Sequence, residues 1–164
     1  KNGTDGTAKI AIHAMQAASR PHHFLGINKD GQASIVSTTG NPYGHLVLRG
    51  GKSGPNYHLE AVKGVANDLS VASLPARLMV DCSHGNSNKD FRKQSEVLRE
   101  VASQLKQGSN NIMGVMIESQ LVEGNQKLDE DLSKLVYGQS ITDACIDITT
   151  TEVLLSELAD SIQL

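Results

Sequence analysis

The chain has 164 residues, of which 38% are apolar, and a net charge of −3. This size and balance describe one ordinary soluble domain and exclude the strongly basic surface that nucleic-acid binding requires. No apolar run approaches the roughly 20 residues that cross a bilayer, so no membrane association is expected. The two cysteines, Cys82 and Cys145, are too few for a disulfide framework and indicate a reducing compartment, so we expect a cytoplasmic protein.

The first elements in chain order are a helix and a hairpin. Residues 1–7 (KNGTDGT) resemble the loop between a strand and a helix, without the strand that should precede it, so we expect the chain to be cut. Apolar residues at helical spacing predict a helix over residues 5–19, with Thr4 or Asp5 as its cap. Two β-prone runs around an Asp-Gly turn then predict an inserted β-hairpin at about residues 23–37.

Three later apolar runs each end in residues that can bind ligands. They are residues 45–51 (HLVLRGG), 78–86 (LMVDCSHGN) and 112–118 (IMGVMIE). Arg49, His84 and Glu118 are 35 and 34 positions apart, which matches one strand, one helix and their two loops. The equal spacing predicts consecutive βα units.

The intervening segments show the helical stripes that such units need. Helices are predicted over residues 57–73, with Asn56 as the cap, and over residues 90–107, with Gly108 as the stop. Residues 123–134 are predicted to form a long loop over the mouth of a barrel, and a closing helix should span about residues 150–162.

The whole pattern predicts an α/β fold, namely the C-terminal half of a (β/α)8 TIM barrel with an inserted β-hairpin. A complete barrel typically needs about 250 residues. Residues 1–164 are therefore interpreted as a single incomplete domain, the second half of such a barrel.

His84, Glu118 and Asp143 are predicted to share the rim of this barrel, because the first two end neighbouring strands and the third lies in the following loop. One imidazole and two carboxylates suit Mn²⁺, Fe²⁺, Co²⁺ or Zn²⁺ with positions left open for substrate. Singly, His84 could cap a helix and the acids could be solvated loop residues, but a shared rim favours a metal site. Cys82 could be a fourth ligand, because residues two apart on a strand share a face, although free cysteines more often serve as packing residues.

Arg49 and Lys1 are predicted to supply positive charge at the same rim. Arg49 is followed by two glycines, which let backbone N–H groups approach an anion while the guanidinium binds phosphate or carboxylate. Arg49 could instead form a salt bridge within the barrel wall. Together with a metal ion, the two cations indicate an anionic, phosphorylated substrate, so that Lys1, Arg49 and His84 are the predicted catalytic residues.

Five stretches in order resemble the microbial, feedback-regulated type of 3-deoxy-arabino-heptulosonate 7-phosphate (DAHP) synthase. They are residues 1–6 (KNGTDG), 48–52 (LRGGK) with 55–57 (PNY), 81–87 (DCSHGNS), 118–119 (ES) with 123–126 (EGNQ), and 137–145 (YGQSITDAC). The likeness runs the length of the chain and covers only the C-terminal half of that enzyme. The order of the stretches disfavours two alternatives, another metal-dependent barrel aldolase and a non-catalytic binding or oligomerisation module.

The resemblance implies a transferase that condenses phosphoenolpyruvate with erythrose 4-phosphate, giving DAHP and phosphate as the first step of the shikimate pathway to the aromatic amino acids. It implies that His84, Glu118 and Asp143 are metal ligands and that Lys1 and Arg49 bind phosphoenolpyruvate. The family's cysteine ligand lies on an earlier strand, so this chain alone is expected to be inactive. The resemblance also implies that the hairpin helps to bind an effector, Phe, Tyr or Trp, and that the protein is a dimer or tetramer.

Overall fold

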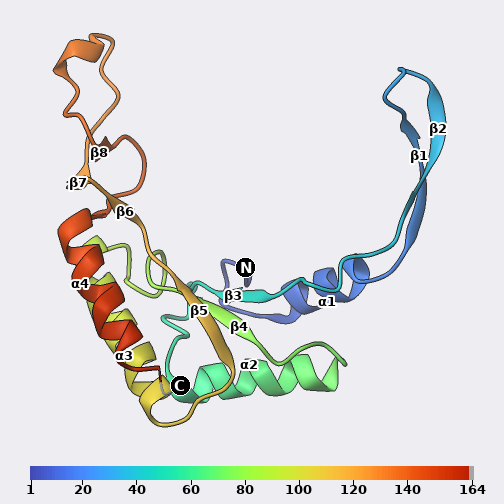
Figure 1. Ribbon diagram of the computed structural model, residues 1–164, viewed down its shortest axis with the longest axis horizontal. Coiled ribbons are helices and arrows are strands. Elements are labelled where there is room, and N and C mark those ends of the chain that lie inside the picture. The colour runs from blue at the N-terminus through green and yellow to red at the C-terminus, as the bar shows by residue number, and fades with distance from the viewer. Residues whose placement is uncertain (163–164) are drawn as a thin grey trace.

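A parallel sheet of three strands forms the centre of the computed structural model, which describes residues 1–162 (Figure 1). The strands are β3 (Leu46–Leu48), β4 (Leu78–Asp81) and β5 (Ile112–Met116), and they lie in that order in the sheet. Helix α2 (Leu59–Val71) connects β3 to β4, and helix α3 (Gln94–Lys106) connects β4 to β5. The predicted alternation of strands and helices is therefore confirmed.

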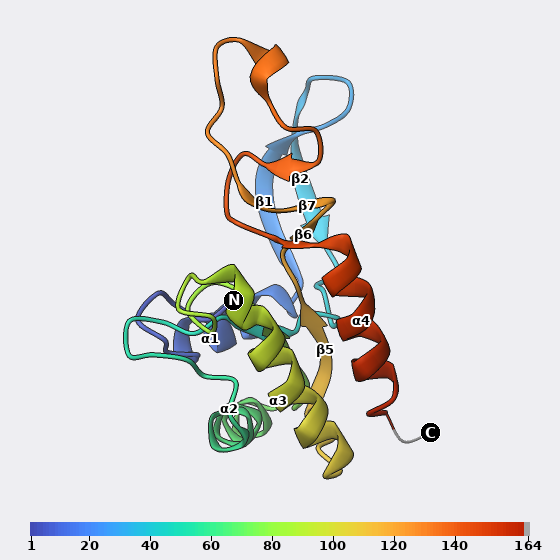
Figure 2. The same cartoon turned by 90° about the vertical axis from the view of Figure 1, so that its left-hand side faces the viewer.

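The helices pack on one face of this sheet. Alternate strand residues point toward them and are buried, whereas Val47 and Met79, which point to the other face, are partly exposed. Figure 2 shows α3 beside α4 (Ile148–Ala159), which closes the chain. The core between sheet and helices includes Leu46, Leu48, Leu78, Val80, Leu69, Leu98 and Leu154, with Ile12 from helix α1 (Lys9–Ala18).

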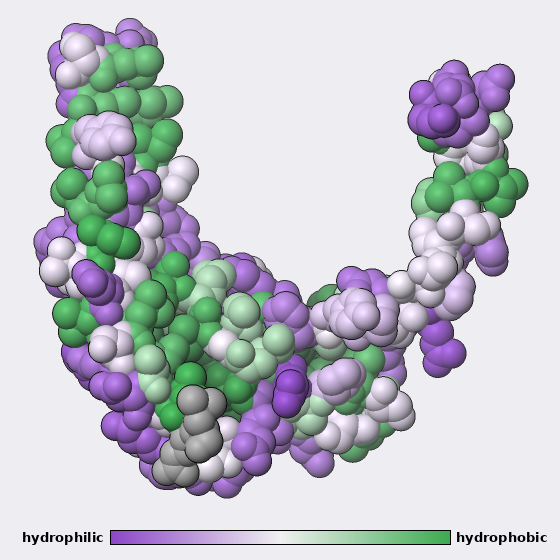
Figure 3. Space-filling model, in the orientation of Figure 1, coloured by the Kyte–Doolittle hydropathy of each residue, from purple (hydrophilic) through white to green (hydrophobic). Residues whose placement is uncertain are grey.

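Two β-structured arms extend beyond this body and give the molecule a U shape in Figure 1. One arm is the antiparallel pair β1 (His22–Ile27) and β2 (Ala33–Thr38), which forms where the hairpin was predicted. The other arm contains β6 (Ser119–Gln120), β7 (Val122–Asn125), a 3-10 turn at Leu132–Lys134, β8 (Gln139–Ser140) and β9 (Ile146–Asp147). Figure 3 shows apolar side chains on both arms and in the hollow between them.

The starts of two helices differ from the prediction. Helix α1 begins at Lys9 without a side-chain cap, because Asp5 instead accepts hydrogen bonds from the backbone and hydroxyl of Thr7. Helix α2 begins at Leu59, and the side chain of Asn56 accepts a hydrogen bond from Gly50 instead of capping this helix. Asp5 and Asn56 therefore do not cap these helices, because their side chains bind other backbone groups.

Two later segments also differ. Residues 123–134 are not only a loop, since they include most of β7 and the 3-10 turn. The closing helix α4 begins two residues early because the carboxylate of Asp147 accepts a hydrogen bond from the backbone of Thr150. Within residues 1–162, no helix combines the length and apolarity that a bilayer span demands.

Candidate active site

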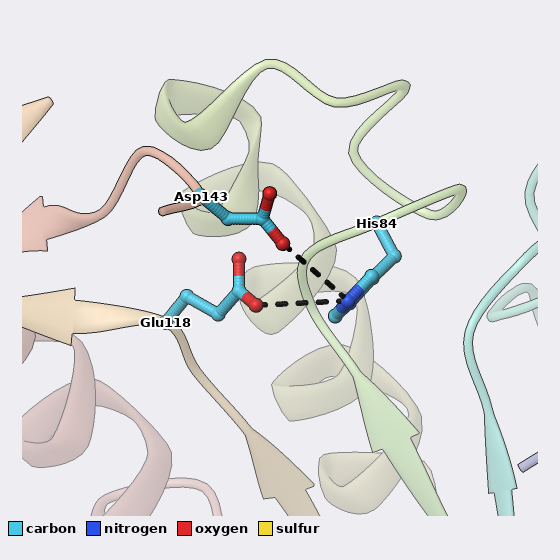
Figure 4. Close-up of side chains that lie close together, drawn as sticks. All are labelled: His84, Glu118 and Asp143. Atoms are coloured by element: carbon cyan, nitrogen blue, oxygen red, sulfur yellow. Dashed lines mark ion pairs between the residues drawn. The ribbon is translucent and has the colours of Figure 1, made fainter. Parts of the chain in front are cut away.

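His84, Glu118 and Asp143 come together beyond the ends of the central strands (Figure 4). His84 Nε2 lies 3.6 Å from Glu118 Oε1 and 4.0 Å from Asp143 Oδ2, and one ligand atom from each residue lies within 4.8 Å of the others. Two atoms that bind one ion at about 2.1 Å are at most about 4.2 Å apart. The three residues therefore fit a divalent ion after a small movement, which the exposed side chain of Asp143 permits.

The charges of this cluster favour a cation. Two carboxylates at such separations repel each other by about 1 to 4 kcal/mol, depending on how much water screens them. A divalent ion between Glu118 and Asp143 would turn this repulsion into attraction, and the imidazole of His84 would complete a borderline-to-hard donor set. The residues present thus match the kind of ion that the sequence predicts.

Asp81 stands behind His84 and was missed by the sequence analysis. Its carboxylate is fully buried, and Oδ2 lies 2.9 Å from both Lys1 Nζ and His84 Nδ1. The contact between Asp81 Oδ2 and His84 Nδ1 has the distance of an ion pair but not the alignment of a hydrogen bond. Oδ1 accepts a hydrogen bond from Ser83 N at 2.9 Å. A carboxylate on one ring nitrogen directs the other toward the metal position, as is usual for metal-binding histidines.

Three asparagines fix the backbone that carries Arg49. Asn2 Oδ1 accepts from Arg49 N at 2.7 Å, and Asn56 Oδ1 accepts from Gly50 N at 2.8 Å. Asn86 accepts from Asn56 N and donates to the carbonyls of residues 48 and 81. Because Asn2 and Asn86 are buried, these hydrogen bonds are protected from water. The three asparagines therefore hold the strand end in place through hydrogen bonds.

A cavity of about 150 Å³ lies beside the acids, and Arg49 lines it together with His84, Glu118 and Asp143. Lys1 does not line it. The ammonium of Lys1 contacts the same Asp81 oxygen as His84 does, and it also lies 3.3 Å from Met116 Sδ. The structure thus brings four of the five predicted site residues to one cavity and places the fifth one carboxylate away.

Lys89 is a further cation that the sequence analysis did not identify. It lines this cavity and a neighbouring one of about 310 Å³, which Arg49 and Lys52 also line. Lys89 has a left-handed backbone (φ 62°), and so has His84 (φ 52°), a conformation that is uncommon in residues other than glycine. The backbone N–H of Lys89 donates to the carbonyl of His84 at 2.8 Å, so one turn fixes both residues.

The surroundings of the two cysteines indicate structural roles. Cys82 is fully buried in the apolar core, where burial, and then the charge of Asp81, raises its thiol pKa to about 12. Its interpretation as a packing residue is confirmed. Cys145 is partly exposed, and its pKa is raised by burial and by the charges of Glu118 and Asp143, although Ser140 opposes the shift.

Comparison with known proteins identifies the family. The model of the DAHP synthetase I family matches residues 1–156. The chain belongs to this family. Among relatives, the Tyr-sensitive phospho-2-dehydro-3-deoxyheptonate aldolase of Salmonella typhimurium is 51% identical over 158 residues, which are 96% of this chain and 44% of that protein. The Phe-sensitive enzyme of Escherichia coli K12 is 50% identical over 99% of this chain and 46% of its own length.

The fold agrees with this membership. The structure of phospho-2-dehydro-3-deoxyheptonate aldolase from Francisella tularensis superposes with a TM-score of 0.92 at 46% identity, covering 99% of this chain and 47% of that one. The chain thus spans about half the length of these family members. The family resemblance seen in the sequence is confirmed.

Proposed function

We propose that this chain forms the metal-binding half of a DAHP synthase, which condenses phosphoenolpyruvate with erythrose 4-phosphate and releases phosphate. The observation that carries the proposal is the meeting of His84, Glu118 and Asp143 beside Arg49, in a chain of the DAHP synthetase I family. The activity is proposed for the natural polypeptide that contains this sequence.

The three ligands would hold Mn²⁺, Fe²⁺, Co²⁺ or Zn²⁺. When bound, the ion supplies Lewis acidity that polarises the aldehyde of erythrose 4-phosphate. The chain's own residues prepare for this. Asp81 orients His84, and Ser83 Oγ donates to Glu118 Oε2 at 2.6 Å. The side chains of His84 and Glu118 therefore have few alternative rotamers.

Arg49 and Lys1 would bind the phosphate and carboxylate of phosphoenolpyruvate. Arg49 is suited to this because its backbone is fixed by buried asparagines while its side chain faces the cavity. Lys1 would act from the side of Asp81, and a substrate anion would then share the ammonium with that carboxylate. Lys89 adds positive charge at the same opening.

The wider architecture is proposed on the same basis. The chain forms parallel βα units, and one face of their sheet is turned to a hollow. This arrangement is evidence for the second half of a (β/α)8 barrel, in which residues 1–164 are one incomplete domain and β1–β2 is an insertion. Leu25, Ile27 and Ile35 on the hairpin are strongly exposed, which supports a role in effector binding or in a dimer or tetramer. The effector would be an aromatic amino acid, and the location the cytoplasm.

The test is consumption of phosphoenolpyruvate with erythrose 4-phosphate by the full natural polypeptide, with and without a chelator. Chelation should abolish turnover, and added Mn²⁺ should restore it. His84→Ala should reduce kcat by at least about 1,000-fold, because it removes one of the three proposed ligands. His13→Ala, at an exposed position on α1, is the matched control and should leave turnover unchanged. Full activity after chelation, or in His84→Ala, would contradict the proposal.

A further inference from the structure

Gln94, the first residue of α3, is a fully buried polar side chain that the chemistry above does not use. Its amide binds the backbone of Glu118 twice. Oε1 accepts from Glu118 N at 2.8 Å, and Nε2 donates to Glu118 O at 3.0 Å. Because a backbone N–H can only donate, these contacts fix which end of the amide faces which group. A residue 24 positions earlier therefore holds both backbone polar groups of a proposed metal ligand.

Glu118 needs this support because it lies where the sheet changes partners. Before it, β5 pairs with β4, and Cys82 N donates to Met116 O at 2.8 Å. After it, β6 pairs with β9, and Ile146 N donates to Glu118 O at 3.1 Å. Between the two ladders, Gln94 supplies the acceptor that a neighbouring strand would otherwise offer to the N–H of Glu118.

The side chain of Glu118 is held at a second point. Oε2 accepts the hydroxyl of Ser83 at 2.6 Å, which leaves Oε1 as the oxygen that faces His84 Nε2 at 3.6 Å. Gln94 fixes the backbone of Glu118 and Ser83 fixes Oε2, so Oε1 is the oxygen left for a metal ion and its position is defined. Metal affinity depends on such placement to within about 0.5 Å.

We propose that Gln94 is a positioning residue for Glu118, and that it sets the affinity of the site for a divalent ion. The inference rests on the metal site of the proposed function. Without the amide, the N–H of Glu118 would lose its acceptor, and the chain between β5 and β6 could shift the carboxylate away from His84. Gln94 itself is not a ligand, since both ends of its amide are used by the backbone of Glu118.

The same helix offers a matched control. Gln104 is also buried in α3, with 1% of its surface exposed, and its Nε2 donates to the carbonyl of Tyr57 at 2.9 Å. It lies ten residues further along the helix, about 15 Å from Gln94. Replacing either glutamine with methionine keeps the approximate size and removes buried hydrogen bonds, but only Gln94 binds a proposed ligand residue.

The experiment is a titration with Co²⁺ alone of the full natural polypeptide and of its Gln94→Met and Gln104→Met variants, followed by visible absorption. Gln94→Met should raise the dissociation constant for Co²⁺ by about 10-fold or more and change the absorption bands, because the ligand geometry changes. Gln104→Met should also lower thermal stability, yet keep the dissociation constant within about twofold and the spectrum unchanged. Gln94→Asn retains an amide, but its side chain is one methylene shorter and cannot reach the backbone of Glu118 in the same way, so Co²⁺ binding should weaken too. This variant replaces Gln94→Met in the experiment if Gln94→Met does not fold.

Three outcomes would overturn the inference. A folded Gln94 variant with the original affinity and spectrum would do so, as would an equal loss in Gln104→Met. Absence of Co²⁺ binding by the unmutated protein would remove the metal site together with the role of Gln94. By contrast, tight Co²⁺ binding that weakens in Gln94→Met, with no condensation of the two phosphorylated substrates, would support the inference and reject only the proposed reaction.

Discussion

Replacing Asp81 with asparagine tests whether a buried carboxylate organises this site. Asp81 Oδ1 accepts from Ser83 N, so the amide oxygen of the variant should stay there, and its nitrogen should face Lys1 and His84. Lys1 would then lose its acceptor and His84 Nδ1 would lose the carboxylate oxygen beside it, while the size of the side chain is unchanged. The substitution therefore removes the link between the ammonium and the imidazole without opening a cavity.

The cost in stability can be bounded from the geometry. Opposite charges 2.9 Å apart attract by about 1.4 kcal/mol in water and about 5.7 kcal/mol at an effective dielectric constant of 20. Because 35% of the Lys1 side chain is exposed, the ammonium can regain water, so the loss should lie near the lower value, about 1 to 2 kcal/mol. A typical domain is stable by 5 to 15 kcal/mol, roughly, so Asp81→Asn should fold.

Metal affinity should respond more strongly than stability. Loss of the carboxylate behind a ligand histidine typically weakens metal binding by about 10- to 100-fold. Co²⁺ titration of the full natural polypeptide would measure this, with urea unfolding as the measure of stability. Asp68→Asn, on the exposed face of α2, makes the same change of charge and should affect neither. Unchanged Co²⁺ affinity in folded Asp81→Asn would refute the reasoning.

Three further predictions concern other parts of the molecule. Gly50 has a left-handed backbone (φ 68°) packed against a neighbouring loop, so Gly50→Ala should lower the free energy of unfolding by at least about 1 kcal/mol in urea titrations; an unchanged midpoint would contradict this. Iodoacetamide at pH 8 should label Cys145 before Cys82, because burial raises the pKa of the Cys82 thiol to about 12. Peptide mass mapping measures the order of labelling, and earlier labelling of Cys82 would contradict this prediction. Hydrogen bonds from the first turn of α4 hold the pKa of Asp147 below its ordinary value of 3.8, so its stabilising effect relative to Asp147→Ala should be present above pH 3.8 and disappear as the pH falls through the lowered pKa. An advantage that persisted at still lower pH in unfolding experiments would count against this assignment.

The sequence predicted the residues whose position follows from the ends of strands. His84 and Glu118 each follow a short apolar run, and parallel strands in one sheet bring their carboxyl ends to one edge. Arg49 follows by the same rule, and its cavity contains both. The position of Asp143 could not be predicted from a strand end alone, because this residue lies in a loop between short strands. The motif around it nevertheless indicated the same rim.

The residues that hold these ligands could not be predicted in the same way. The ion pair between Asp81 and Lys1 spans 80 positions, and the hydrogen bonds of Gln94 with the backbone of Glu118 span 24, so neither contact has a local pattern. Asn56 shows the reverse problem. Its place before a helical stripe favoured a cap, but the fold offers it Gly50 N, a partner that only the packed rim creates. Local propensity cannot weigh such distant partners.

The register between β4 and β5 explains why the ligands meet at all. Leu78 pairs with Ile112, but the next residue of β4, Met79, pairs with Gly114, so β5 carries one extra residue, Met113. Successive residues of a strand point to opposite faces, and a shift of one position would therefore turn the side chain that follows β5 away from the cavity. With the extra residue, Glu118 faces His84 at 3.6 Å. A bulge near the far end of the strand thus determines the geometry at its tip, and the ligand cluster depends on strand pairing as much as on the identity of its own side chains.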